Sequence, residues 1–350
     1  MAEQPATLRA GRVANHGNRD PVPNGGGYVA YRVTPDMWEE PWILRLLAAL
    51  PISRYCVLDA RTRPAPHPRR QRWSRRLESR LPGRVRSARR FWLDRIVPRD
   101  HCLFIYNTWA LDYHTISELA VLLSRYEHVG VVSIDESGVD SPDFYAQVSF
   151  AVRIGFGGPR YAAVRNLLVT PLGVPKHFVR PARLPALRER RFSWSFLGEL
   201  KNPVRKEMAA QLRSVQGRSF LHAISTWGAE ESIRGAAYSK VLADSVFVPS
   251  PSANVHCECY RTYEALECDA IPVVDTPYYR DVLGAPFPVV GADWEDAPHL
   301  LNTLLGDPES LEALHRECRD WWGSVKAAYP EYVRRLAEGR GAATPVGNVA

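Results

Sequence analysis

Short apolar runs alternate with amphipathic segments along most of this 350-residue chain. The pattern is clearest in residues 238–274, where a helical segment leads into an apolar run at residues 246–248 that predicts a buried strand. Prolines and small polar residues then predict a turn over residues 249–254. A second amphipathic helix ends near Asp269, and residues 270–274 predict another buried strand. This is the strand–loop–helix–strand order of a parallel α/β unit.

The same alternation continues on both sides of this stretch. Strands are expected at residues 28–33, 55–58, 102–106, 129–134, 167–171, 192–197 and 287–290. Helices are expected at residues 38–50, 116–126, 144–154, 204–215, 293–305 and 308–338. Alternating strands and helices predict an α/β chain with mainly parallel sheets, and 350 residues suit two domains of ordinary size.

Three charged residues follow the turn at residues 249–254. Glu258, Arg261 and Glu264 lie at i, i+3 and i+6 of the helix after that turn, so they form one stripe on its first two turns. In a parallel α/β unit this end of the helix lies at the carboxyl edge of the sheet, where ligands bind. On spacing alone, an ordinary ladder of surface ion pairs explains the stripe better.

A second candidate anion site follows the strand at residues 192–197. That strand ends at Gly198, and Asn202 with Pro203 fits the N-cap and first position of a helix. Lys201 and Arg205 lie at the mouth of this helix, whose N-terminus attracts anions. A helix start with incidental surface cations explains the spacing equally well.

The C-terminal half resembles a known enzyme family in its motifs. The run Y-x-x-x-L-x-x-S-x-F-V-P-S from Tyr238, followed by E-x-x-R-x-x-E-A-L-E-C-D-A-I-P-V-V from Glu258, resembles the C-terminal signature of exostosin-like glycosyltransferases. It also resembles the related C-terminal domain of ribitol xylosyltransferases. The sequence departs from the family pattern twice: residues 250–254 lack the usual glycine, and Asp269 stands where a small residue, often glycine, is expected.

The N-terminal half carries a less specific resemblance to bacterial exostosin-like proteins. It lies in the run V-G-V-V-S-I-D-E-S, in F-A-V-R-I-G and in L-L-V-T-P-L-G-V. Asp135, Glu136 and Arg153 occupy the matching positions. The acidic pair directly follows a predicted strand, which is where a ligand crevice is expected.

The resemblance implies a GT-B type α/β fold, with two facing Rossmann-like domains and an interdomain cleft. We expect a flexible N-terminus at residues 1–27 and an acceptor-side domain at residues 28–180. A linker at residues 181–191, within a Pro- and Arg-rich run, precedes a nucleotide-sugar-binding domain at residues 192–340. Such an enzyme is an inverting hexosyl- or pentosyltransferase that moves a sugar from a nucleotide-sugar donor to an acceptor hydroxyl. The acceptor is a glycan, a lipid-linked intermediate or a small molecule, and polysaccharide biosynthesis is the expected setting.

The chemistry of such a donor assigns roles to the candidate residues. A ribose diol needs a carboxylate acceptor, for which the resemblance favours Glu264. Cations and N–H groups bind a diphosphate and stabilise it as a leaving group. The candidates for that role are Arg261, Lys201, Arg205 and the N–H groups of residues 250–254, which include Ser250, Ser252 and Asn254. Glu258 is expected to orient Arg261 or to contact the sugar.

Inverting transfer also needs a base that deprotonates the acceptor hydroxyl. Asp135 or Glu136 is the predicted catalytic base, and Asp112 and His114 are the reserve candidates. No cofactor beyond the nucleotide-sugar is expected. No metal is strictly required, and the scattered cysteines lack a zinc-like spacing.

Charge is concentrated in one predicted insertion, residues 61–100. It holds fourteen Arg against Glu78, Asp94 and Asp100, a net of +11, so the rest of the +7 chain has about −4. Apolar and aromatic residues interleave with these arginines. The pattern is typical of a solvated surface excursion, of a basic hairpin on an anionic membrane or, less so, of a nucleic-acid-binding patch.

Localisation and the rival functions complete the interpretation. Residues 1–27 lack a continuous apolar segment, which predicts a cytoplasmic protein, either free or peripheral to the inner face of the membrane. The main alternative is a catalytically degenerate sugar- or nucleotide-binding protein of the same fold, favoured by the missing loop glycine. A nucleic-acid-binding protein is less favoured, because the chain outside the insertion is slightly acidic.

Overall fold

The computed structural model describes residues 27–32, 37–57, 101–107, 128–134, 140–155, 159–226, 229–253 and 257–340. Several sequence predictions lie outside the described residues. They are the Arg-rich insertion at 61–100, the expected helix at 116–126, and the candidates Asp112, His114, Asp135, Glu136 and Asn254.

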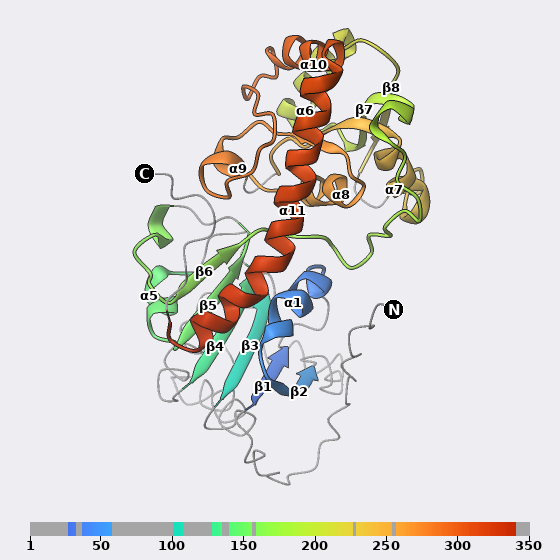
Figure 1. Cartoon of the computed structure of the whole chain (residues 1–350). Coiled ribbons are helices and arrows are strands. Elements are labelled where there is room, and N and C mark those ends of the chain that lie inside the picture. Colours follow the sequence, from blue (N-terminus) through green and yellow to red (C-terminus); the bar gives the residue numbers. More distant parts are fainter. Residues whose placement is uncertain are drawn as a thin grey trace, which may run out of the picture. The chain divides into compact units, whose positions relative to one another are not determined.

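The chain forms two compact units (Figure 1). The first contains residues 1–37, 47–169 and 332–342, and the second contains residues 38–46, 170–331 and 343–350. The division near residue 170 differs from the expected linker at residues 181–191. The physical reason is that this Arg-rich segment is fastened to the second unit. Arg190 donates hydrogen bonds to the carbonyl oxygens of Ser245 at 2.7 Å and Asp269 at 2.6 Å.

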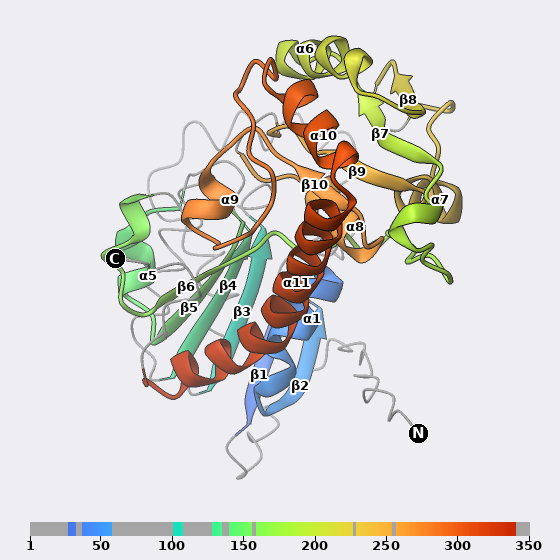
Figure 2. The same ribbon diagram turned by 45° about the horizontal axis from the view of Figure 1, so that its top comes forward.

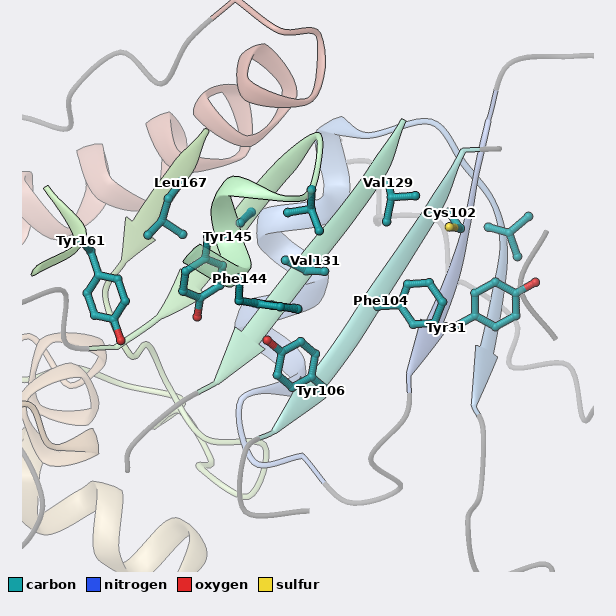
Figure 3. Packing of buried hydrophobic residues seen from close by; sticks show 13 residues of the cluster. Tyr31, Cys102, Phe104, Tyr106, Val129, Val131, Phe144, Tyr145, Tyr161 and Leu167 are labelled. Atoms are coloured by element: carbon teal, nitrogen blue, oxygen red, sulfur yellow. The ribbon is translucent and has the colours of Figure 1, made fainter. Parts of the chain in front are cut away.

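The first unit is built on a six-stranded sheet with the strand order β2-β1-β3-β4-β5-β6. Its strands are β1 (Tyr28–Arg32), β2 (Ile52–Val57), β3 (Cys102–Asn107), β4 (Val129–Ile134), β5 (Phe150–Ile154) and β6 (Leu167–Thr170). The pairs from β2 through β5 are all parallel. Aromatic and aliphatic side chains from these strands and from α5 (Pro142–Ala146) pack into one core along the sheet (Figure 3).

The predicted helix at residues 144–154 is wrong. The structure ends α5 at Ala146 and places β5 over the second part of that segment. Every residue of β5 is buried, because a neighbouring strand lies on each side and the core lies on its faces. Because β5 is buried on both faces, its residues show no alternation of apolar and polar positions that would distinguish a buried strand from a buried helix.

The second unit is built on a four-stranded parallel sheet with the order β10-β9-β7-β8. Its strands are β7 (Phe192–Glu199), β8 (Ser219–Ile224), β9 (Ser245–Pro249) and β10 (Ile271–Val273). The helices assigned here are α1 (Glu40–Leu46), α6 (Pro203–Gln211), α7 (Gly235–Ala243), α8 (Tyr260–Glu267), α9 (Tyr278–Asp281) and α10 (Ala297–Gly306). The long α11 (Pro308–Ala337) has residues in both units. In Figure 2, α7 and α8 lie on one side of this sheet and α6 and α10 on the other.

These two sheets confirm the prediction of an α/β chain with two Rossmann-like parts. The strands expected around residues 192–197, 246–248 and 270–274 are β7, β9 and β10. The strand expected at residues 287–290 is only an isolated bridge between Val274 and Val289. The helix expected from residue 293 begins at Ala297, because Trp294 has a positive φ of 62° that no α-helix contains.

Asp269 departs from the family pattern at a position that favours glycine. Its φ is +58°, in the left-handed region that ends many helices and that Asp tolerates better than most residues. Its Oδ2 lies 3.1 Å from Nε2 of His315 and 3.6 Å from Nη2 of Arg190. The Asp269 carbonyl oxygen accepts hydrogen bonds from the same two residues, at 2.6 Å for Arg190 and 2.7 Å for His315, so the carboxylate adds a second tie that a glycine would lack.

Candidate functional site

The candidate site lies at the carboxyl edge of the second sheet. From β7 the chain passes to β8 on one side of the sheet, and it then returns to β9 on the other side. The carboxyl ends of β7 and β9 therefore form a topological switch point, where open parallel sheets bind their ligands. Gly198 and Glu199 end β7, and Ser250 follows β9.

Arg261 reaches this switch point from the first turn of α8. Its Nη2 donates a hydrogen bond to the Leu197 carbonyl oxygen at 3.0 Å, and its guanidinium carbon lies 4.2 Å from the ring centre of Phe196. A Cβ at Gly198 would lie 2.8 Å from that Nη2, so the close approach requires glycine. The buried Nε of Arg261 has no hydrogen-bond partner among the described residues.

Arg205 brings a second cation to the same place from α6. Its Nη1 lies 3.4 Å from the Glu199 carbonyl oxygen, and its buried Nε also has no partner within the described chain. Burial, followed by the charge of Arg261, lowers the pKa of Arg205. Two guanidiniums that repel each other in a half-buried place favour an anion between them.

The start of α6 is formed as the sequence predicts. Asn202 Oδ1 accepts a hydrogen bond from the Val204 N–H at 2.9 Å, and Pro203 begins the helix. This capping holds Arg205 at the first turn beside the end of β7. Lys201, the third predicted cation, is exposed just before the cap.

Glu264 lies one turn after Arg261 and is buried, with 7% of its surface exposed. The Tyr238 hydroxyl on α7 donates to its Oε2 at 2.6 Å. Burial raises the pKa of Glu264, and this effect is opposed by the Tyr238 hydrogen bond and by the charge of Arg261. Among the described residues, this bond to Oε2 is the hydrogen bond that the Glu264 carboxylate accepts, and Oε1 accepts none.

Tyr238 is a residue of the site that sequence reasoning missed. It was noted only as part of a helical pattern and as the first letter of the resembling motif. The one signal in the sequence is that Tyr238 opens the resembling motif on α7, while Glu264 belongs to the same motif on α8, the next helix. Because α7 and α8 both pack on β9, their polar residues meet at the same edge.

Glu258 has a different environment from the one predicted. It is fully buried, and its Oε2 accepts hydrogen bonds from the Leu172 N–H at 3.0 Å and from the Tyr263 hydroxyl. These bonds fasten the segment after β6 to the start of α8. The roles expected for Glu258, in orienting Arg261 or contacting a sugar, remain predictions.

In the loop after β9, the N–H groups of Ser250 and Ser252, which were expected to bind a phosphate, donate hydrogen bonds within the protein. The Ser250 N–H donates to the Val273 carbonyl oxygen at 2.7 Å, which extends the pairing of β9 with β10. The Ser252 N–H donates to both carboxylate oxygens of Asp275, at 2.9 and 3.1 Å, and the Ser252 hydroxyl donates to Oδ1 at 2.7 Å. A phosphate at Ser252 would have to compete with this carboxylate.

In the first unit, Arg153 is part of a buried ion pair. It is 1% exposed and lies 2.9 Å from Asp140, with its guanidinium 4.6 Å from the ring centre of Tyr161. Ser133, at the end of β4, also bonds to Asp140 at 3.3 Å. The network thus fixes both flanks of the segment that carries Asp135 and Glu136, which themselves lie outside the described residues.

No helix in the described part of the chain is long and apolar enough to cross a membrane. The same residues contain no group of three or more His, Cys, Asp or Glu side chains that could hold a metal ion. The expectation that transfer needs no metal stays a prediction.

The match to known proteins is most specific in the second unit. Residues 176–302 match the family described as the RXYLT1 C-terminal domain. The chain is also 28% identical over 187 residues to ribitol-5-phosphate xylosyltransferase 1 of Danio rerio, a match that covers 46% of this chain and 42% of that protein. Both findings confirm the resemblance read from the motifs of the C-terminal half. The chain spans less than half the length of that relative.

Two solved structures resemble the chain at low identity. An α1,3-fucosyltransferase has a TM-score of 0.49 at 9% identity, covering 91% of this chain and 92% of its own. The glycosyltransferase SnogD from Streptomyces nogalater has a TM-score of 0.40 at 12% identity, covering 89% of this chain and 99% of its own. At these TM-scores neither likeness carries an argument, and the fold assignment rests on the two parallel sheets.

Proposed function

We propose that this chain, whose residues 176–302 match the RXYLT1 C-terminal domain, is an inverting glycosyltransferase of GT-B type. It transfers a sugar from a nucleotide-sugar to an acceptor hydroxyl. The observation that carries the proposal is the grouping of Arg261, Arg205 and the Glu264–Tyr238 pair at the switch point of the second sheet. Each group has the chemistry that one part of such a donor requires.

The two arginines form the diphosphate site. Their guanidiniums are anchored by the carbonyl oxygens that end β7, and each keeps a buried Nε without a partner in the described residues. Fixed cations of this kind stabilise a nucleoside diphosphate as negative charge develops on it during departure. Lys201 adds a more distant positive charge.

Glu264 is the ribose-binding carboxylate. Its Oε1 accepts one ribose hydroxyl, while Tyr238 holds Oε2 and keeps the side chain in one orientation. The charge of Arg261 favours the ionised carboxylate that accepts such a bond, although burial opposes ionisation.

The first unit supplies the acceptor side in this proposal. In this proposal Asp135 or Glu136 takes the proton from the attacking hydroxyl. Support comes from the sequence, in which this acidic pair directly follows β4. Their flanks are held by the Arg153–Asp140 network.

The finer assignments follow from weaker support. The relative's name favours transfer of a pentose, xylose, to a ribitol phosphate or a similar polyol phosphate, and a hexose remains the alternative. The Arg-rich residues 61–100 favour a cytoplasmic enzyme that contacts an anionic membrane surface while it acts on a glycan or lipid-linked acceptor.

A degenerate nucleotide-sugar-binding protein is the second candidate. One observation favours it: the Ser250 and Ser252 N–H groups, expected at the phosphate, already bond to Val273 and Asp275. Such a protein binds the donor without turnover.

Release of nucleoside diphosphate from a nucleotide-sugar separates the two candidates. The expected result is slow release through transfer to water, because an ordered donor site stabilises the leaving group even without the natural acceptor. Arg261→Gln should abolish this release, while Arg280→Gln, an exposed arginine paired with Asp281, should leave it unchanged. Tight donor binding without any release, with water or with polyol phosphates added, would favour the binding protein.

A further inference from the structure

Asp275 is a charged residue of this edge that neither the motif nor the roles proposed above include. It follows β10 by two residues, and its carboxylate accepts three hydrogen bonds from Ser252, in the loop after the neighbouring β9. The side chain is only half-buried. It is therefore a fixed anion that a ligand at the edge of the sheet can reach.

The charged groups of the edge follow one another in a definite order. Asp275 and Ser252 lie at the ends of β10 and β9, and Arg205 and Arg261 lie at the end of the adjacent β7. Glu264 lies one helical turn beyond Arg261, against α7. The order is carboxylate, two guanidiniums, carboxylate.

Neighbouring members of this series act on one another electrostatically. The charge of Arg261 opposes the burial that raises the pKa of Glu264. Arg205 has a pKa that is lowered first by burial and then by Arg261, while Asp275 raises it. In the strand order β10-β9-β7, Asp275 follows the outer strand and so lies at the end of the series away from Glu264.

A nucleotide-sugar has the complementary order of groups. Its ribose diol and its sugar hydroxyls are hydrogen-bond donors that carboxylates recognise, and the diphosphate between them needs cations. With the ribose at Glu264 and the diphosphate at the two arginines, the sugar lies at Asp275.

We propose that Asp275, held by Ser252, is the residue that recognises the donor sugar, and that it selects a neutral sugar over a uronic acid. This inference rests on the proposed function. The carboxylate accepts one or two sugar hydroxyls, while a sugar carboxylate at the same place is repelled. This role also explains why Ser252 donates its hydrogen bonds to Asp275. The loop after β9 orients the sugar-binding carboxylate, while the two arginines bind the phosphates.

Binding measured by titration calorimetry tests this inference. The probes are the diphosphates of adenosine, cytidine, guanosine, uridine and thymidine, each beside its glucose conjugate, with UDP-xylose and UDP-glucuronate added. Wild type should bind a neutral conjugate more tightly than the matching diphosphate. Asp275→Asn should lose about tenfold of that gain, or about 1.4 kcal/mol, and keep the affinity for the diphosphate.

Control variants distinguish sugar recognition by Asp275 from a purely structural role in holding the loop after β9. Asp281→Asn makes the same chemical change at an exposed residue of the same unit and should bind as wild type does. Ser252→Ala, which removes one of the three bonds to Asp275, should lose part of the gain in the same direction. If UDP binds, wild type should bind UDP-glucuronate more weakly than UDP-glucose, and Asp275→Asn should narrow that difference.

Three outcomes would overturn the inference. Equal loss of diphosphate and conjugate in Asp275→Asn would make the residue structural. A large gain in diphosphate affinity in Asp275→Asn would show that the Asp275 carboxylate occupies a phosphate site at Ser252. If Asp275→Asn kept the full difference in affinity between the conjugate and the diphosphate, the sugar would bind elsewhere, and the proposed donor site would still stand. If folded wild type bound none of the diphosphates, the proposed function would fall, and this inference with it.

Discussion

Single residues decide how the candidate donor site is built. Arg261 is held against Phe196 and the Leu197 carbonyl oxygen only because Gly198 has no side chain. Glu264 is kept in place by one phenol, that of Tyr238. At this scale the site depends on a few close contacts that can be changed one at a time.

Gly198→Ala should impair the site without unfolding the protein. The new Cβ would lie 2.8 Å from Nη2 of Arg261, at the movable end of a side chain, and residues with a Cβ rarely adopt the φ of +156° at this position, so the guanidinium and the end of β7 both shift. We expect roughly a tenfold or greater loss of diphosphate affinity, because a hydrogen bond to a charged group contributes about 1.5–3 kcal/mol. Titration calorimetry measures the loss, and Gly323→Ala, which has open space around its Cβ, is the control. Unchanged affinity in Gly198→Ala would argue against the position given to Arg261.

Glu264 should make the protein less stable as the pH rises. Its folded pKa lies above its unfolded value because of burial, so the folded state holds its proton more tightly. Its contribution is therefore complete below the unfolded pKa of about 4.3 and is lost as the pH rises through the folded pKa. Glu264→Gln should remove this pH dependence and be at least as stable as wild type at pH 7. Urea unfolding at several pH values measures how the free energy of unfolding changes with pH. A wild type that loses more stability than Glu264→Gln as the pH falls would contradict this prediction.

At the scale of elements, polar ties join α8 to α11. Glu267, at the end of α8, accepts hydrogen bonds from the Trp322 indole at 2.7 Å and from Lys326 at 2.8 Å. It also lies 3.5 Å from Arg180, which precedes the expected linker at residues 181–191. Asp269 makes the similar tie with His315. These contacts fix the C-terminal end of the helix whose first turn carries Arg261.

Glu267→Gln should therefore destabilise the second unit by about 1–3 kcal/mol. Burial raises the pKa of Glu267, but Lys326 and Trp322 outweigh it, so the folded pKa is lowered. Its stabilisation is present above the unfolded pKa and is lost as the pH falls through the folded value. Denaturant unfolding at neutral pH and at about pH 3–4 tests this, since wild type and variant should converge in acid. The exposed Glu317→Gln on α11 should differ little from wild type at either pH.

The elements that sequence predicts well are those with a clear signal. The polar turn and periodic charges around α8 identified β9, α8 and β10, and the Asn202–Pro203 cap identified α6. β5 was mistaken for helix because it is buried on both faces and shows no alternation of apolar and polar residues, and β8 was missed. The inward and outward positions of β8 alternate, but Ser219, His222 and Ala223 give little contrast in polarity along it. Tertiary packing decides such segments.

The candidate site was predictable in part for the same reason. Motif and cap spacing picked out Arg261, Glu264 and Arg205 as candidates, and all three lie within the first two turns of regular helices. The partners of Tyr238 and Asp275 are 26 and 23 residues away in sequence, so only the folded structure brings them together. Glu258 shares the helical stripe in sequence, yet it points to Leu172 and Tyr263.

At the scale of the whole molecule, the chain has two parallel α/β units, each with a topological switch point. In the first sheet it lies between β1 and β3, and in the second between β7 and β9. The second carries the cations and the carboxylates of the proposed nucleotide-sugar site. The first carries Asp135 and Glu136 after β4 in sequence. A division of donor and acceptor between the units is what the proposed transfer requires.

The most direct test of this account is a thermal-shift titration of the full chain with the five nucleoside diphosphates. Wild type should be stabilised by one of them, by about 2.7 kcal/mol at a hundredfold excess over the dissociation constant. Arg261→Gln and Arg205→Gln should each lose this stabilisation while their unliganded unfolding transitions remain cooperative, and Arg280→Gln should keep it. If every diphosphate leaves the folded wild type unshifted, or if both site variants respond as wild type does, the donor site is not at the end of β7.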